Sequence, residues 1–149
     1  MNKEDWVKIM EELPNGRRIC DVHKGDYNEI YLPVLAANMI GKPLFELLRK
    51  KGSCELIRNY CNAMEQMWRE GDQEVMDALE MTILEHLSED EVIWQRFGTY
   101  VSEDFRNYIN EEVLEGNIMM SGVERLQNME PKCRKAGGLY EGNGEREIR

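Results

Sequence analysis

Apolar residues recur every three to four positions along most of the chain, which is the spacing of a helix that buries one face. The clearest case is the segment 53–70, where apolar side chains fill one side of the helical wheel and polar side chains fill the other. The apolar side is formed by Leu56, Ile57, Tyr60, Cys61, Ala63, Met64, Met67 and Trp68. This pattern predicts an amphipathic helix packed against a core.

Residues that favour helix starts mark further helices. Asn2 with Asp5 predicts a first helix that ends at the break formed by residues 14–16. Ser88 and Glu91 match a capping box, so another helix is expected to start at about residue 89, with Leu87 and Val92 as its hydrophobic staple. Further caps are expected at Ser53, Asp72 and Ser102, for helices over 53–70, 73–87 and 102–116.

The segments between residues 17 and 51 are less regular. Residues 17–25 show no clear period and are predicted to be a loop, with His23 in solvent. Asp26 offers a helix start, while Pro33 predicts either a kink or a later beginning. Pro43 suits the first turn of a short helix that ends in cationic residues before Gly52.

These segments predict an all-α fold, either a compact bundle or a short helical-repeat-like stack of about six helices. No strand alternation is evident, and no fixed internal period supports a true repeat. We expect one helical domain over residues 1–130. The Gly-rich, polar segment 131–149 is expected to be mobile or to be docked by a partner.

The composition is that of an ordinary globular protein of 149 residues, with 42% hydrophobic and 32% charged residues. A chain of this length buries about two thirds of its unfolded surface in one core. The N-terminal residues lack the features of a secretory signal, and nowhere do about 18 apolar residues run together. A cytoplasmic location is therefore expected.

The net charge of −10 is concentrated in one internal block. Residues 1–64 hold ten Lys and Arg against nine Asp and Glu, and residues 116–149 hold six against five. Residues 65–115 hold three cationic residues against fifteen acidic ones. Such a field attracts basic proteins and disfavours direct binding to nucleic acids or anionic membranes.

The sequence predicts no catalytic residue, metal ligand or cofactor. It has no nucleophile elbow, P-loop, dinucleotide fingerprint or kinase motif, and its four cysteines form no CxxC pair. His86 falls within the apolar arc of its helix, which indicates a core histidine bonded to a backbone carbonyl or to Glu80. Catalysis by carboxylates that converge on folding stays open as a further alternative.

Acidic residues gather at the predicted helix starts of the acidic block. Part of this placement is local, since carboxylates favour helix N-termini by about 0.3 to 1 kcal/mol. The shortage of nearby cations is not explained in this way, so we expect an exposed acidic surface that binds a partner. Its candidate residues are Asp72, Glu74, Asp77, Glu89, Asp90, Glu91, Glu103 and Asp104, with Tyr100 as an exposed aromatic anchor.

The span 53–120 resembles the small acidic all-helical immunity proteins of contact-dependent growth inhibition and other polymorphic toxin systems. The resemblance is carried by EQMWREGDQEVMDALEMTILEHL and FGTYVSEDFRNYINE, and no catalytic residue can be transferred from it. It implies a bacterial inhibitor that binds and neutralises the C-terminal domain of a cognate toxin, often a basic nuclease. The alternative is a helical-repeat adaptor or scaffold that binds another basic protein or peptide.

Overall fold

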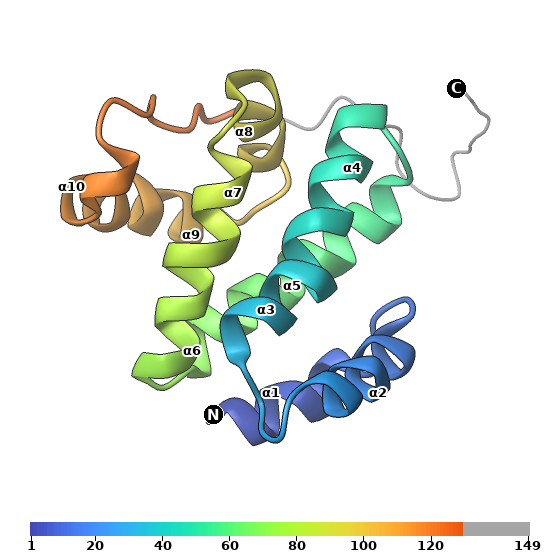
Figure 1. Ribbon diagram of the computed structural model, residues 1–149. Coiled ribbons are helices and arrows are strands. Elements are labelled where there is room, and N and C mark those ends of the chain that lie inside the picture. The colour runs from blue at the N-terminus through green and yellow to red at the C-terminus, as the bar shows by residue number, and fades with distance from the viewer. Residues whose placement is uncertain (130–149) are drawn as a thin grey trace.

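A computed structural model describes residues 1–129, which form a compact all-α bundle of seven helices (Figure 1). The N-terminal part contains α1 (Lys3–Met10), α2 (Gly16–Asp26), α3 (Leu32–Ala36), α4 (Lys42–Lys50) and α5 (Cys54–Glu70). The rest contains α6 (Gln73–Ala78), α7 (Glu85–Leu87), α8 (Glu91–Gly98), α9 (Glu103–Tyr108) and α10 (Leu114–Gly116). The predicted all-α class is confirmed, and the compact bundle is the form it takes. The predicted tail, 131–149, lies outside the described residues.

Three of the seven helices contain a π-helical turn, in which the hydrogen bond spans one residue more than in an α-helix. The turn η1 (Ala37–Gly41) joins α3 to α4, η2 (Leu79–Leu84) joins α6 to α7, and η3 (Ile109–Val113) joins α9 to α10. Each trio forms one continuous helix. Such turns are often found at functional sites.

The core runs through the whole bundle. Among its largest fully enclosed side chains are Trp6 of α1, Trp94 and Phe97 of α8, and Phe105 of α9. Helix α4 contacts α5 and α8, while α6 contacts α1 and α3, so both parts of the chain share this core. Burial of such aromatic residues supplies much of the apolar area on which folding depends. Both parts of the described chain therefore contribute to one hydrophobic core.

Most predicted helix starts are confirmed at the level of single hydrogen bonds. Asn2 and Asp5 form the expected capping box of α1. The backbone N–H of Leu56 donates to Ser53 Oγ over 3.2 Å, and the N–H of Val75 donates to an Asp72 carboxylate oxygen over 3.0 Å. Ser102 caps α9 in the same way. These caps are local, which is why the sequence predicts them.

The capping box predicted at Ser88 is wrong. The Ser88 hydroxyl donates to the carbonyl oxygen of Glu85 over 2.7 Å and so stabilises the end of α7. Helix α8 begins two residues later than predicted, and its cap is Asp90, which accepts from the N–H of Ile93 over 3.0 Å. Val92 is 58% exposed and forms no staple.

The loop predicted over residues 17–25 is also wrong, because this segment is helix α2. The helix has no side-chain cap; it begins after Asn15, whose backbone is left-handed with φ 60°. Gly16 is required at this corner, since a Cβ there would lie 2.2 Å from the carbonyl oxygen of Met10. Cys20 and His23 are buried on the inner face. Tertiary packing supplies the stability that local start signals do not.

A final segment, residues 121–129, lies against α8 and the helix α9–η3. It follows a 3₁₀ turn, η4 (Ile118–Met120). Beyond it, the side chain of Asn110 both donates to the carbonyl oxygen of Leu126 and accepts from its N–H. Trp94 Nε1 donates to the carbonyl oxygen of Glu124 over 2.8 Å. Gly98 leaves space for Leu126, whose side chain would be 2.9 Å from a Cβ at that position.

Candidate protein-binding surface

The predicted acidic residues fall into three separate groups. Asp72, Glu74 and Asp77 lie in the first turns of α6 and are exposed. Glu89, Asp90 and Glu91 lie at the exposed turn between α7 and α8. Because α6, η2 and α7 form one continuous helix, these two groups are separated by its length of about 20 Å. Glu103 and Asp104 form the third group, exposed at the start of α9.

Several of these carboxylates have local structural roles. Asp72 and Asp90 are helix caps, Asp77 accepts from Gln73 Nε2 over 2.7 Å, and Glu91 accepts from Gln95 Nε2 over 2.9 Å. Their exposed side chains still present negative charge to solvent. An amide at Asp72 or Asp90 retains the capping oxygen, so charge and capping can be separated by mutation.

Helices α6 to α10 lie on one side of the molecule and α1 to α4 on the other (Figure 1). We call the first side, residues 72–116, the acidic half. Within the described residues, two of its carboxylates have a cationic partner: Glu74 pairs with Lys3 (3.7 Å) and Glu111 pairs with Arg125 (3.3 Å). Glu89 lies 3.2 Å from Nδ1 of His86. The remaining carboxylates have no cation at ion-pair distance among these residues. The acidic half is therefore largely uncompensated.

An acidic and aromatic cluster that the sequence did not reveal lies between the predicted groups. The hydroxyl of Tyr108, on α9, donates to the carboxylate of Glu80, on η2. The ring of Trp68, at the end of α5, lies 5.1 Å from that of Phe105 and 5.4 Å from that of Tyr108. Burial and the carboxylates of Glu80 and Glu112 raise the pKa of Tyr108 above its usual value, so it remains a donor.

Sequence spacing gave no sign of this cluster, because its members come from three helices and meet only through tertiary packing. Trp68 and Tyr108 are half-buried and therefore keep part of their rings at the surface. Aromatic side chains beside unpaired charges are typical of the residues that dominate protein interfaces. The cluster joins α6–η2 to α9, between the first and third acidic groups.

Tyr100 is less exposed than predicted. Its side chain is half-buried, its hydroxyl lies 3.5 Å from Cys54 Sγ, and the guanidinium of Arg58 lies 5.7 Å from its ring centroid. Burial raises the pKa of its hydroxyl. Tyr100 therefore packs between α5 and the α8–α9 turn, and only part of its ring can reach a partner.

Among residues 1–129, the most exposed of the large apolar side chains belong to the turn η4, next to the acidic end of α10. Ile118 is 87% exposed and Met119 is 70% exposed. The turn itself is ordered, because Asn117 accepts from the N–H of Met119 over 2.9 Å and the neighbouring Met120 is buried. Two apolar side chains are thus held in solvent by a fixed backbone.

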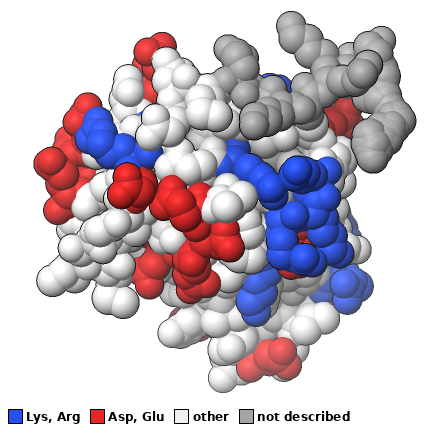
Figure 2. Space-filling view, turned by 90° about the horizontal axis from the view of Figure 1, so that it is seen from above, with Lys and Arg blue, Asp and Glu red and all other residues white. Residues whose placement is uncertain are grey.

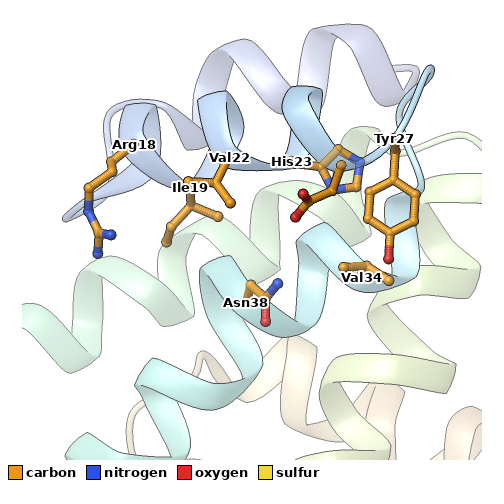
Figure 3. A pocket seen from close by; sticks show the side chains of 8 residues that line it. Arg18, Ile19, Val22, His23, Tyr27, Val34 and Asn38 are labelled. Atoms are coloured by element: carbon orange, nitrogen blue, oxygen red, sulfur yellow. The ribbon is translucent and has the colours of Figure 1, made fainter.

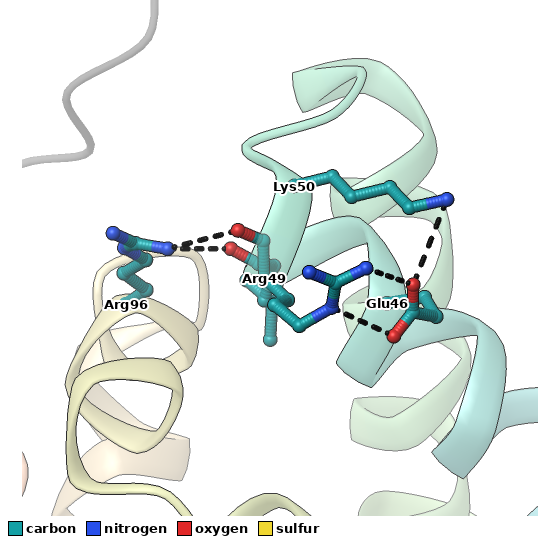
Figure 4. A network of polar contacts seen from close by, with 5 residues as sticks. Glu46, Arg49, Lys50 and Arg96 are labelled. Carbon is teal, nitrogen blue, oxygen red and sulfur yellow. Dashed lines mark hydrogen bonds and ion pairs between the residues drawn. The ribbon is translucent and has the colours of Figure 1, made fainter.

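Cationic residues gather on the opposite side. Seen from above, the largest cluster of Lys and Arg lies on one side of the surface, and most of the Asp and Glu lie on the other with a smaller cationic group among them (Figure 2). At the end of α4, Glu46 accepts from Arg49 and lies 3.6 Å from Lys50 Nζ. Arg96 of α8 donates to the carbonyl oxygen of Leu48 over 2.8 Å and so joins the acidic half to α4 (Figure 4).

His86 differs from its predicted position. A regular α-helix over this segment would point the His86 side chain toward the core. The π-helical turn η2 holds one extra residue before His86, so the last turn of the helix is rotated and the side chain points elsewhere. The side chain is 32% exposed, its Nδ1 lies 3.2 Å from Glu89, and its ring lies 4.8 Å from that of Phe45. Glu80, the partner expected for it, instead accepts from Tyr108.

Neither a metal cluster nor a membrane-spanning helix is found in the described part of the chain. In residues 1–129 no group of three or more His, Cys, Asp or Glu side chains could hold a metal ion. Over the same residues, no helix combines the length and apolar character that crossing a membrane requires.

The fold and its surface place this protein in the class of compact all-α bundles, and its acidic half is largely uncompensated. A family model described as "Domain of unknown function (DUF7674)" matches residues 7–115, and the chain belongs to that family. Curated proteins and solved structures give no match. The family match covers α2 through α9 and η3, and therefore both charged sides of the bundle.

Proposed function

We propose that this protein is a binding protein whose acidic half captures a basic protein partner, in the manner of an immunity protein that neutralises a toxin domain in the bacterial cytoplasm. The observation that carries this proposal is the uncompensated charge of the acidic half. Its carboxylates repel one another at a cost to the free protein, and a cationic partner relieves that repulsion. Opposite charge also accelerates the encounter of the two proteins.

Exposed apolar side chains support this proposal. Charge complementarity raises the association rate and orients the partners, but it contributes less to affinity, which apolar contacts supply. Ile118 and Met119 are exposed beside the acidic end of α10, and Trp68 and Tyr108 are partly exposed beside Glu80. Their surroundings fit an interface with an apolar centre and a charged rim. The partner expected from this arrangement is a protein with cationic residues around an apolar depression.

A rescue assay tests the toxin-inhibitor form of the proposal. The C-terminal domain of the product of the adjacent upstream gene is expressed in a bacterial host with and without this protein, and survivors are counted. Growth arrest that only co-expression relieves supports the proposal. Growth arrest without rescue contradicts it for that partner, and absence of arrest contradicts the pairing with that gene.

Charge variants then test the surface. Asp77→Asn, Glu91→Gln, Glu103→Gln and Asp104→Asn together remove four charges from the three acidic groups. Glu4→Gln, Glu12→Gln, Glu29→Gln and Glu55→Gln remove four exposed charges from α1 to α5 and form the matched control. We expect the first variant to lower the association rate with the partner at least tenfold at low salt, and the control to change it little. Equal effects would contradict an acidic binding surface.

The cationic residues at the end of α4 favour an adaptor as the second candidate. A bundle with Arg49, Lys50 and Lys51 on one side and carboxylates on the other can bridge two partners of opposite charge. An adaptor would bind its partners without altering their activity. The rescue assay therefore distinguishes the two, and pull-down at low salt followed by the same charge variants tests the second.

A further inference from the structure

A groove of about 320 Å³ lies between α2 and the helix formed by α3 and η1, on the side of the molecule away from the acidic half (Figure 3). This volume is at the lower end of the range for small-ligand sites, about 300 to 1,000 Å³. Ile19 and Val22 of α2 and Val34 of α3 form its apolar walls. Val22 is 56% exposed, so this apolar surface is left open to solvent.

His23 places a hydrogen-bond donor in this groove. The residue is 6% exposed, and its Nε2 accepts from the backbone N–H of Tyr31 over 2.9 Å. A neutral imidazole that accepts at Nε2 carries its proton on Nδ1. Among the described residues, Nδ1 has no acceptor. This atom is not fully enclosed by the protein, and His23 lines the groove, so the Nδ1 proton is accessible there.

The prediction that His23 lies in a solvated loop is therefore wrong, and its burial has a physical reason. Its ring stacks on Tyr27 at a centroid distance of 4.6 Å, and its acceptor nitrogen holds the start of α3 against α2. Because the second contact fixes the tautomer, the orientation of the donor is fixed as well. Because the Nδ1–H donor of this buried side chain has no acceptor from the described residues, water or a bound ligand must supply the acceptor.

Asn38 lies on the opposite wall and belongs to the π-helical turn η1 (Figure 3). Its amide is half-buried and has no hydrogen-bond partner among the described residues. A primary amide presents one acceptor and two donors together, which matches the N–H and C=O groups of a peptide bond. With His23 opposite, the middle of the groove offers donors from both walls and one acceptor.

Two residues of opposite charge line the groove. Arg18 and Asp26 both belong to α2, and neither has an ion-pair partner in the described part of the chain. Eight residues of α2 separate them, which corresponds to about 12 Å along the helix. An extended peptide covers this distance with about four residues.

We propose that this groove binds the C-terminal end of an extended peptide of about four residues. The free carboxylate lies on Arg18, a peptide group pairs with Asn38 and the Nδ1 proton of His23, and an amine at the other end lies on Asp26. Apolar side chains of the peptide pack on Ile19, Val22 and Val34. An α-amino acid is too short for this distance, and a purely apolar ligand leaves all four polar groups unused. This inference does not depend on the proposed function.

Titration of the intact protein with defined tetrapeptides tests the proposal. The probes are Lys-Val-Leu-Val, Lys-Val-Leu-Leu and Lys-Val-Leu-Phe, each with a free C-terminal carboxylate, and the same three peptides as C-terminal amides. Binding is followed by calorimetry and by the amide resonances of residues 18–38. We expect at least one free acid to bind saturably and its amide to bind about tenfold more weakly, since a charged hydrogen bond is lost.

Arg18→Gln is the informative variant, and Arg17→Gln is its matched control, because Arg17 is also exposed on α2 but does not line the groove. Arg18→Gln is expected to weaken the free acid about tenfold and to leave the amide unchanged. Arg17→Gln is expected to change neither. The proposal is overturned if no free acid binds saturably at millimolar concentration, if acid and amide bind equally, or if the two variants behave alike.

Discussion

Charged residues are used differently in the two sides of this bundle. In α4, Glu46 is held by Arg49 and Lys50, and residues 1–64 contain nearly equal numbers of cations and carboxylates. In residues 65–115 there are three cations, and two of them contact backbone carbonyl oxygens instead of surface carboxylates: Arg96 reaches Leu48, and Arg106 reaches Gly98. The scarce cations of this region thus stabilise the fold, and the surface charge stays uncompensated.

One carboxylate of the region, Glu65, is buried. It is 7% exposed, it accepts from the N–H and the hydroxyl of Ser102 over 2.9 and 2.7 Å, and it lies 3.4 Å from Arg69. Glu65 thereby joins α5 to the start of α9. The same residue type serves as a buried connector here and as unpaired surface charge a few turns away.

Mutation of Glu65 is the strongest way to separate these two uses. Glu65→Ala leaves the two Ser102 donors without their acceptor and is expected to lower the free energy of unfolding by about 3 kcal/mol. Glu65→Gln retains one acceptor oxygen and should cost less. Urea denaturation measures both, with the exposed Glu55→Ala as a control expected to change stability by less than about 0.5 kcal/mol. If Glu65→Ala changes stability as little as Glu55→Ala, the buried Glu65 does not stabilise the fold more than an exposed carboxylate does.

Neutralising surface acids at helix ends should have a smaller effect of opposite sign. Glu70 ends α5, and Glu112 and Glu115 lie near the end of the helix that contains α10, where negative charge is unfavourable. Replacing all three by Gln is expected to raise the free energy of unfolding by about 1 kcal/mol at low salt.

The control for this effect is Glu4→Gln with Glu55→Gln, at the starts of α1 and α5, which should lower stability slightly. Both effects are expected to fade in 1 M salt, where the screening length is about 3 Å. A gain that persists at high salt would mean that repulsion among the carboxylates is not its cause.

Tyr108 gives a test at alkaline pH. Its pKa is raised in the folded protein, chiefly by burial and then by Glu80, so the fold favours the protonated hydroxyl. An unfolded tyrosine ionises at about pH 10. Stability should therefore fall as pH rises above about 10, and Tyr108→Phe should reduce this fall. Thermal unfolding between about pH 8 and 11 brackets that value and measures the difference, and identical slopes would contradict a raised pKa of Tyr108 in the folded protein.

Glu46 gives the smallest expected effect, at acidic pH. Hydrogen bonding from Arg49 and the charge of Lys50 lower the pKa of its carboxyl to about 2. The stability from this lowered pKa is present above about pH 4.3, the unfolded value, and is lost as pH falls toward about 2. NMR titration of the carboxyl carbon checks the pKa, and Arg49→Gln should move it back up. Because this carboxylate is exposed to solvent, little change in unfolding is expected.

The features predicted correctly are those set by neighbouring residues. The helix over 54–70 is indicated by its apolar stripe, and the caps at Ser53, Asp72 and Ser102 each need only a hydroxyl or carboxylate two or three residues from a free N–H. Local rules favoured Ser88 over Asp90 as the cap of α8, but the Ser88 hydroxyl donates to the carbonyl oxygen of Glu85, and Asp90 is the cap. The eight acidic candidates at the predicted helix starts are exposed.

The features missed depend on contacts between distant segments. Helix α2 has weak local signals, and the burial of His23 depends on Tyr31 and on the start of α3. The Tyr108–Glu80 contact joins residues 28 positions apart. The inward side-chain position predicted for His86 assumed a regular α-helix. The residue types in Leu79–Leu84 do not indicate that a π-helical turn forms there.

The three π-helical turns have a consequence for how this family can change in length. Each turn holds one residue more than an α-helix needs, within a helix that continues on both sides. Deleting one residue inside Ala37–Gly41, Leu79–Leu84 or Ile109–Val113 should restore α-helical hydrogen bonding at that turn. A deletion elsewhere in these helices would rotate the residues that follow it, so their apolar face would turn away from the core. Single-residue insertions and deletions among family members are therefore expected at these three places.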